Sequence, residues 1–206
     1  RYPQRQPESK HFINWFKNNG FSVHPLPDEY YFEGEGDALF FGDTLVGGYR
    51  FRSDIQSHSY MSELIKKEIL SVELVNRHFY HLDTCFCPLN HESALFFPDA
   101  FDTYGIKVLR NLVSKLIPVP EVDARKFCCN AVVLGNKIII NKCSDKLRNK
   151  IENLGFEIFS LEFSEYIKAG GSSKCMVLFL KNDLSEAPGP KASENSFIGE
   201  QTGEDS

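Results

Sequence analysis

The sequence lacks the features of a membrane protein and of a nucleic-acid-binding protein. No segment approaches the ~20 apolar residues that a membrane-spanning helix needs, and the polar, proline-containing start does not resemble a signal peptide. The basic residues form no stripe, and the formal net charge is −5, so the electrostatic footprint for nucleic acid is missing. We therefore expect neither a membrane partner nor a nucleic-acid partner.

The sequence also has no CxxC pair, although it contains six cysteines. Without a secretory context they are expected to be reduced thiols in a cytoplasmic protein, most of them buried as small hydrophobic residues. One segment is dense in metal-ligand types, but on a strand its residues would form a row and not a tetrahedron. These residues are His78, His81, Asp83, Cys85, Cys87 and His91. We therefore predict no metal and no cofactor.

The length of 206 residues fits one domain with a tail. Residues 1–181 carry the large apolar residues. From residue 182 onward the composition shifts to Glu, Ser, Gly and Pro, which is typical of disorder. We predict one domain over residues 1–181 and a disordered acidic tail over residues 182–206.

The domain contains an internal repeat. A helical pattern ends at Gly20 before a predicted strand at residues 21–23, and another ends at Gly155 before a predicted strand at residues 156–158; glycine accepts the left-handed conformation that ends a helix. A glycine motif and a predicted strand then follow each time, within residues 33–40 and 170–180. Such self-similarity is the signature of a repeat architecture.

Helical and hairpin patterns extend this repeat. Hairpins are predicted at residues 38–51 (turn Gly42-Asp43) and 131–141 (turn Gly135-Asn136). Helices are predicted near residues 8–19, 57–70, 102–116 and 144–154, with Ser57 and Ser144 as N-caps and with Tyr60, Met61, Leu64, Ile65 and Leu70 as the apolar face of the second. Repetition of helix, strand and hairpin predicts an α/β propeller of about four units.

Two distant stretches carry residues suited to thiolate chemistry. Cys175 follows Gly170-Gly171-Ser172-Ser173-Lys174; the glycines allow backbone N–H groups to approach an intermediate, and Lys174 is expected to depress the pKa of the thiol. His81 and Asp83 stand two residues apart in a strand-like run, which would place them on one face. The alternatives are a structural cysteine at the start of a core strand and a half-buried, hydrogen-bonded histidine.

A third stretch offers carboxylates on a glycine-rich turn, namely Glu33, Glu35 and Asp37. Such a turn alone is weak evidence of function. If the repeat holds, however, this loop is equivalent to the loop of Cys175, and its carboxylates could bind a cation. Arg52, which we expect on the next strand, could hold a carboxylate in a bidentate fork.

Together these stretches resemble the guanidino-group-modifying enzymes of the pentein fold. That superfamily includes dimethylarginine dimethylaminohydrolases, arginine deiminases, arginine dihydrolases and amidinotransferases. The resemblance runs in the family's order from Arg1 to about Lys181. It rests on residues 32–39, 48–54, 81–84, 129–132, 162–163 and 170–175.

The resemblance implies a fold and a set of roles. The fold is an α/β, pentein-type propeller. Cys175 is the nucleophile, and His81 protonates the leaving amine and later activates water. Glu33, or Glu35 in its place, binds the guanidinium; Asp83 binds it too or orients His81. Arg52 and Asn130 hold the α-carboxylate of the substrate. Family members carry a further N-terminal module, so we expect about four of five modules here.

The implied activity is hydrolysis of a small guanidino substrate to citrulline through a covalent thiouronium. Dimethylargininase is the first interpretation, with methylated arginine as substrate. Arginine deiminase or dihydrolase, acting on arginine, is the alternative within the class, and a non-catalytic pentein is the alternative outside it. The sequence leaves open whether the chain forms a homo-oligomer.

Overall fold

The computed structural model describes residues 3–180. The described chain divides into two compact units, one of residues 25–178 and another that includes residues 3–24. The predicted acidic tail lies outside the described residues. Among residues 3–180, no helix is both long and apolar enough to cross a membrane.

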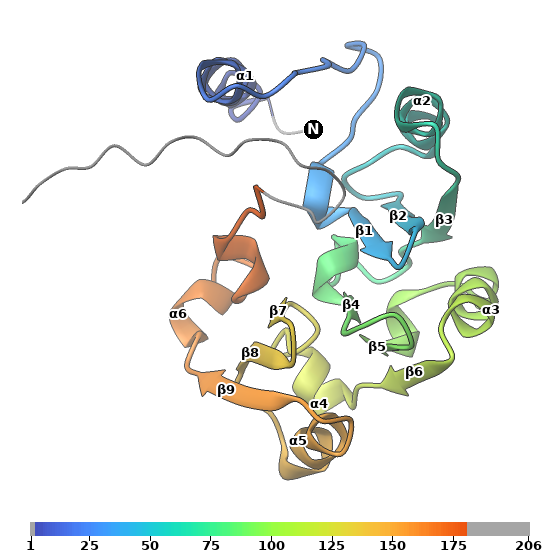
Figure 1. Cartoon of the computed structure of the whole chain (residues 1–206), viewed down its shortest axis with the longest axis vertical. Coiled ribbons are helices and arrows are strands. Elements are labelled where there is room, and N and C mark those ends of the chain that lie inside the picture. Colours follow the sequence, from blue (N-terminus) through green and yellow to red (C-terminus); the bar gives the residue numbers. More distant parts are fainter. Residues whose placement is uncertain (1–2, 181–206) are drawn as a thin grey trace, which may run out of the picture. The chain divides into compact units, whose positions relative to one another are not determined.

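The first unit contains three three-stranded sheets of the same topology (Figure 1). In each, the first two strands form an antiparallel hairpin and the third pairs in parallel with the second. The strands are β1 (Ala38–Phe41), β2 (Thr44–Tyr49) and β3 (Ile69–Glu73); β4 (Phe86–Pro88), β5 (Ser93–Phe96) and β6 (Lys115–Pro118); and β7 (Val132–Leu134), β8 (Lys137–Asn141) and β9 (Glu157–Leu161).

A helix connects the second strand to the third in every sheet, because a parallel pair requires a crossover. These helices are α2 (Ile55–Ile65), α3 (Thr103–Leu112) and α5 (Asp145–Glu152). Shorter segments complete the unit: α4 (Glu121–Ala124), α6 (Ser164–Ile167) and the 3₁₀ helices η1 (Gly34–Gly36), η2 (Leu82–Thr84), η3 (Pro98–Ala100) and η4 (Lys174–Met176). The α/β class and the repetition predicted from the sequence are confirmed.

Local signals explain several of these elements. Gly42 (φ +57°) and Gly135 (φ +61°) occupy the predicted turns of the first and third hairpins. Gly155 (φ +88°) ends α5 before β9. The hydroxyl of Ser144 accepts from the backbone N–H of Leu147 at 3.3 Å, which confirms the predicted N-cap.

The hydrophobic core joins all three sheets and the crossover helices. Its members lie on the strands, at every position of the fully buried β5 but Ser93, and on the helices that cover them, so burial of apolar area stabilises sheet and helix together. Completely buried members include Val46, Val72, Leu95, Leu109, Ile138, Ile140, Leu147 and Ile151.

Two predicted strands do not form. Residues 21–23 and 176–180 have no strand partner within the described part of the chain, and a strand requires a neighbour for its ladder of hydrogen bonds. The apolar side chains of Met176 to Leu180 remain 36–52% exposed. The equivalent stretch after α5 does form a strand, because β8 lies beside it.

Three further details were predicted wrongly. Residues 82–84 form a 3₁₀ turn and not a strand. Asp54, not Ser57, precedes the first residue of α2. The fully buried residues of α2 are Ser57 and His58, whereas the predicted apolar face is half-buried or exposed. The reason is that Gly47 of β2 has no side chain, which leaves room for the imidazole of His58 between strand and helix.

The second unit contains α1 (Glu8–Asn18), which ends at Gly20 (φ +82°) as predicted. None of the residues of α1 is buried. Its aromatic residues contact one another locally, with Phe16 edge-on to both Trp15 and Phe21.

Candidate active site

The loop that carries Cys175 is anchored by Asn130, which lies two residues before the start of β7. The side-chain oxygen of Asn130 accepts from the backbone N–H groups of Ser172 (2.8 Å) and Cys175 (3.2 Å). The hydroxyl of Ser173 donates to the backbone carbonyls of Asn130 (2.9 Å) and Ile139 (3.0 Å). The loop of Cys175 is therefore held on the third sheet without being part of a strand.

The sulfur of Cys175 lies between this loop and Asp83. Its Sγ–H donates to Oδ2 of Asp83 over 3.8 Å. A Cβ atom on Gly171 would lie 2.7 Å from Sγ, so glycine is required for the thiol to occupy this position. Cys175 is exposed, whereas Cys143 is half-buried and the other four cysteines are buried.

The resting form of Cys175 is a thiol. Burial of the sulfur against the loop and the negative charge of Asp83 raise the pKa of Cys175 to about 11, and hydrogen bonds from Asn130 and the Ser172 backbone oppose this only in part. The prediction that Lys174 depresses this pKa is wrong for the unliganded chain, because the ammonium of Lys174 pairs with Glu35.

Asp83 is a buried carboxylic group at the start of η2, with 5% of its surface exposed. Burial, reinforced by the charge of Asp37, raises the pKa of Asp83 to about 7, although the positive charges of His81 and Lys174 oppose the shift. Its Oδ1 atom is buried and has no hydrogen-bond partner among residues 3–180. A buried acceptor without a donor is costly, so this oxygen is suited to receive a donor from a ligand.

His81 is paired with Glu33 and not with Asp83. Nε2 of His81 lies 2.8 Å from Oε2 of Glu33, and the same oxygen accepts from Nη1 of Arg52 at 2.9 Å. Although partial burial alone would raise the pKa of Glu33, the hydrogen bond and charge of His81 and the charge of Arg52 lower it to about 2. Glu33 is thus a carboxylate at neutral pH and fixes the imidazole.

Arg52 lies in the bend after β2 and not on a strand as predicted. Its guanidinium stacks over the ring of Tyr80, 4.7 Å from the centroid. The hydroxyl of Tyr80 donates to the carbonyl of Gly170 at 2.8 Å. Tyr80 was not singled out from the sequence, because nothing in its local pattern reveals a contact with a loop 90 residues away.

The glycine-rich turn of Glu33 separates its three carboxylates. Asp37 is buried and accepts from the hydroxyl of Ser53 (2.7 Å) and the backbone of Leu82 (3.1 Å), so it joins η1 to η2. Gly36 packs against the ring of His81. The predicted equivalence of this loop with that of Cys175 holds to the extent that both enter a 3₁₀ helix, η1 and η4.

The predicted ligand-rich row around His81 is dispersed by the fold. Cys85 and Cys87 are buried in the core, and His78 stacks on Phe127 with 5.1 Å between the ring centroids. Within residues 3–180 no group of three or more His, Cys, Asp or Glu side chains is arranged to hold a metal ion.

The predicted residues form two groups of contacts, one of Cys175, Asp83 and Asn130 and one of Glu33, His81 and Arg52. Tyr80 links the two groups, because it contacts Arg52 and the carbonyl of Gly170 on the Cys175 loop. The site combines an ionised carboxylate, a buried carboxyl group with an open oxygen, a thiol and an imidazole. In such a set the carboxyl groups can accept hydrogen bonds from the N–H groups of a small cation and hold the cation beside the sulfur. Asn130 itself is fully buried and contacts the Asp83 carbonyl at 3.3 Å.

Comparisons with known proteins agree with this chemistry. The family model described as "N,N dimethylarginine dimethylhydrolase, eukaryotic" matches residues 2–181. The chain is 43% identical over 181 residues to the bifunctional arginine dihydrolase/ornithine cyclodeaminase ArgZ of Synechocystis sp., a match that covers 86% of this chain and 26% of ArgZ. It is 33% identical over 178 residues to the N(G),N(G)-dimethylarginine dimethylaminohydrolase of Mycobacterium tuberculosis, covering 86% and 58%.

A solved structure is similar over the same region. The N-terminal domain of an ArgZ variant, covalently bound to a reaction intermediate, superimposes with a TM-score of 0.83 at 43% identity. The match covers 85% of this chain and 66% of that domain. The chain therefore spans about a quarter of the length of ArgZ and 58% of the mycobacterial relative.

Proposed function

Because the chain belongs to the eukaryotic N,N dimethylarginine dimethylhydrolase family, we propose that it hydrolyses a C–N bond in the guanidino group of methylated arginine. The products are citrulline and an amine. The observation that carries the proposal is the open Oδ1 of buried Asp83 beside the sulfur of Cys175. A guanidinium supplies both a positive charge that pairs with the Asp83 carboxylate and an electrophilic carbon that the sulfur of Cys175 can attack.

Binding of the cation prepares the nucleophile. A guanidinium donating to Asp83 replaces the missing partner of Oδ1 and favours the ionised carboxylate. Its positive charge also favours the thiolate of Cys175, whose pKa of about 11 is set by burial and by the charge of Asp83. The proton of the thiol passes by way of Oδ2 of Asp83, its acceptor in the resting structure, to solvent, which leaves Asp83 ionised beside the cation.

Two half-reactions then follow. The thiolate adds to the guanidinium carbon, forming a C–S bond; His81 donates a proton to the departing nitrogen, the C–N bond breaks and the amine leaves. Water next attacks the thiouronium carbon while His81 takes one of its protons. The C–S bond then breaks, the remaining proton of the added hydroxyl passes to the sulfur, and the thiol and citrulline are released. Glu33 orients His81 through the 2.8 Å contact.

Arg52 and Asn130 have different parts in this proposal. Arg52 is held by Glu33 and Tyr80 and is the group that binds the α-carboxylate of the substrate. Full burial of Asn130 favours a positioning role for its side chain, which fixes the backbone of Cys175, over the carboxylate contact that the resemblance implies.

Arginine dihydrolase activity is the second candidate, because identity to ArgZ (43%) exceeds identity to the mycobacterial dimethylargininase (33%). In that case arginine is the substrate and ammonia the first amine released. The same thiouronium precedes both products, so the site chemistry does not change.

The finer architecture belongs to the same proposal. Residues 1–181 form a pentein catalytic domain in which the sheets are modules of an α/β propeller. Three sheets of one topology support this, as does the similarity to the N-terminal domain of ArgZ. The six free thiols support a cytoplasmic location.

The test measures citrulline and amine release from asymmetric dimethylarginine and from arginine. We expect turnover by the wild type, a loss of more than about 10³-fold in Cys175→Ala, and little change in the matched variant Cys143→Ala. Dimethylamine as the product identifies dimethylargininase, and ammonia from arginine identifies the second candidate. Retained activity in Cys175→Ala, or no turnover of either substrate by the wild type, contradicts the proposal.

A further inference from the structure

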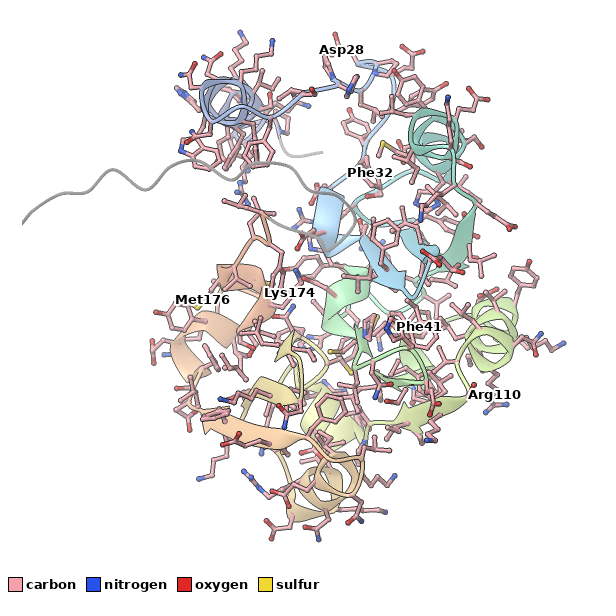
Figure 2. All side chains as sticks on the ribbon, viewed as in Figure 1. Asp28, Phe32, Phe41, Arg110, Lys174 and Met176 are labelled. Carbon is pink, nitrogen blue, oxygen red and sulfur yellow. The ribbon has the colours of Figure 1, made fainter. Side chains whose placement is uncertain are left out.

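Glu35 is the second of the two glutamates in the acidic turn Glu33-Gly34-Glu35-Gly36-Asp37. The proposed reaction gives it no direct role. Its carboxylate forms a close ion pair with the ammonium of Lys174 (Lys174 is labelled in Figure 2). The Lys174 side chain is only 11% exposed, and that of Glu35 is 35% exposed. The pair is thus shielded from water on the lysine side, where screening by solvent is weaker.

The pair joins the two loops that hold the reacting groups. Lys174 directly precedes Cys175, and its backbone N–H donates to the Asn130 carbonyl at 3.2 Å. Glu35 lies two residues after Glu33 and directly before Gly36, which packs on the ring of His81. One contact between residues 139 positions apart therefore links the loop of Cys175 to the loop of Glu33.

The ammonium of Lys174 also lies near the site for the cation. Its charge is among those that act on Asp83. An unpaired ammonium there would repel a guanidinium, whereas an ammonium paired with Glu35 presents a nearly neutral group. A lysine at this position therefore needs its carboxylate partner for the site to remain attractive to cations.

We propose that Glu35 and Lys174 are positioning residues that fix the loop of Cys175 to the loop of Glu33, and that Glu35 neutralises Lys174 so that a guanidinium can bind. This inference rests on the proposed function, since it assumes a cationic substrate at Asp83. It predicts that loss of Glu35 is more harmful than simultaneous loss of Glu35 and Lys174.

The experiment uses two alkylating reagents of nearly equal shape, cationic 2-chloroacetamidine and neutral 2-chloroacetamide. Both alkylate Cys175 with loss of chloride, and the ratio of their rates reports attraction of the cation independently of turnover. The proteins are the wild type, Glu35→Gln, Lys174→Met and the double variant. The matched control is Glu92→Gln, which removes the partner of Lys115 from an exposed ion pair of 2.8 Å.

We expect the cationic-to-neutral rate ratio to fall by about fivefold in Glu35→Gln. It should return to within about twofold of the wild type in the double variant and remain unchanged in Glu92→Gln. Lys174→Met should slow the alkylation of Cys175 by both reagents without lowering the ratio of the cationic to the neutral rate. An unchanged ratio in Glu35→Gln, or a double variant no better than Glu35→Gln, overturns the proposal.

Two further measurements keep the outcomes separable. If Glu35→Gln does not fold, as judged by its thermal transition, the exchanged pair Glu35→Lys with Lys174→Glu replaces it; a wild-type ratio then supports the inference and a lowered ratio contradicts it. A wild type that prefers the cationic reagent but turns over no guanidine contradicts only the proposed function. A wild type with no preference for the cationic reagent contradicts both.

Discussion

At the scale of single residues, two carboxyl groups of one site have pKa values displaced in opposite directions. Glu33 is held near 2, where the His81 hydrogen bond and the Arg52 charge overcome partial burial. Asp83 is raised to about 7 by nearly complete burial. Such separation is typical of sites in which one acid stays ionised and the other responds to a ligand.

Asp83 should make the protein less stable as the pH rises. Its pKa is about 7 in the folded chain against an ordinary value of 3.8, so between these values the folded state binds more protons and stability falls with rising pH. Asp83→Asn should therefore raise the free energy of unfolding by about 2–4 kcal/mol above pH 7 and by almost nothing at pH 4.

Urea unfolding of the wild type and Asp83→Asn from pH 4 to pH 8 measures this difference. Asp43→Asn is the control, because its side chain is 92% exposed and its substitution should leave the pH profile parallel to that of the wild type. A difference between wild type and Asp83→Asn that is constant across the range would refute the assignment.

The thiol of Cys175 should react slowly at neutral pH. Because burial and then the charge of Asp83 raise its pKa to about 11, the rate of alkylation by neutral iodoacetamide should increase about tenfold per pH unit from pH 7 to pH 10. In Asp83→Asn the profile should shift to lower pH, since one of the two causes is removed.

Mass spectrometry of the peptide containing Cys175 follows this reaction, with Cys175→Ser as the blank for the other five thiols. A rate that is already constant below pH 8 would mean that the unliganded protein holds a thiolate.

At the scale of elements, the site is built on turns that the sheets hold in place. Glu33 directly precedes the 3₁₀ helix η1, and Asp83 and Cys175 are the middle residues of η2 and η4. Such short helices are stable only when tertiary contacts hold them. Here Asp37 ties η1 to η2, and Asn130 ties η2 to the loop before η4.

Gly171→Ala should separate activity from stability. The added Cβ would lie 2.7 Å from Sγ of Cys175, so the thiol must move and activity should fall by at least about 100-fold. In Gly155→Ala the added Cβ meets no atom within 4 Å, but the φ of +88° is strained, and we expect a loss of about 1 kcal/mol in stability with normal activity.

Citrulline release and thermal unfolding, measured on both variants, check this pair. Equal activity in the two variants would show that the contact between residue 171 and the sulfur has no catalytic consequence.

At the scale of the whole molecule, burial differs between the two compact units. Sheet strands of the first unit are completely buried at residues such as Val46, Ile138 and Ile140. Helix α1 of the second unit buries none of its 11 residues. A helix of this length is marginal in water without tertiary packing, so the local free energy of opening should be low there.

Hydrogen exchange should therefore distinguish the units. Amides of α1 should exchange within seconds to minutes at neutral pH, whereas those of β2 and β8 should exchange only through larger openings, at least about 10³-fold more slowly. Protection of α1 equal to that of β8 would mean that the helix is covered in solution.

Part of this structure follows directly from local sequence. The turns at Gly42 and Gly135, the cap at Ser144 and the glycine stops at Gly20 and Gly155 were all predictable, because each depends on the conformational preference of a few adjacent residues. The type of chemistry that we propose also follows from His81, Asp83 and Cys175 in the sequence, since few residue types serve as nucleophile and acid.

What the sequence by itself determined, then, is the repeated element order and the set of reactive residues. Only the tertiary structure decided which side chain each carboxylate contacts. It paired His81 with Glu33, left an oxygen of Asp83 open, raised the pKa of Cys175 and joined Glu35 to Lys174. These outcomes depend on burial and on contacts between distant turns, and neither quantity is encoded in the spacing of neighbouring residues.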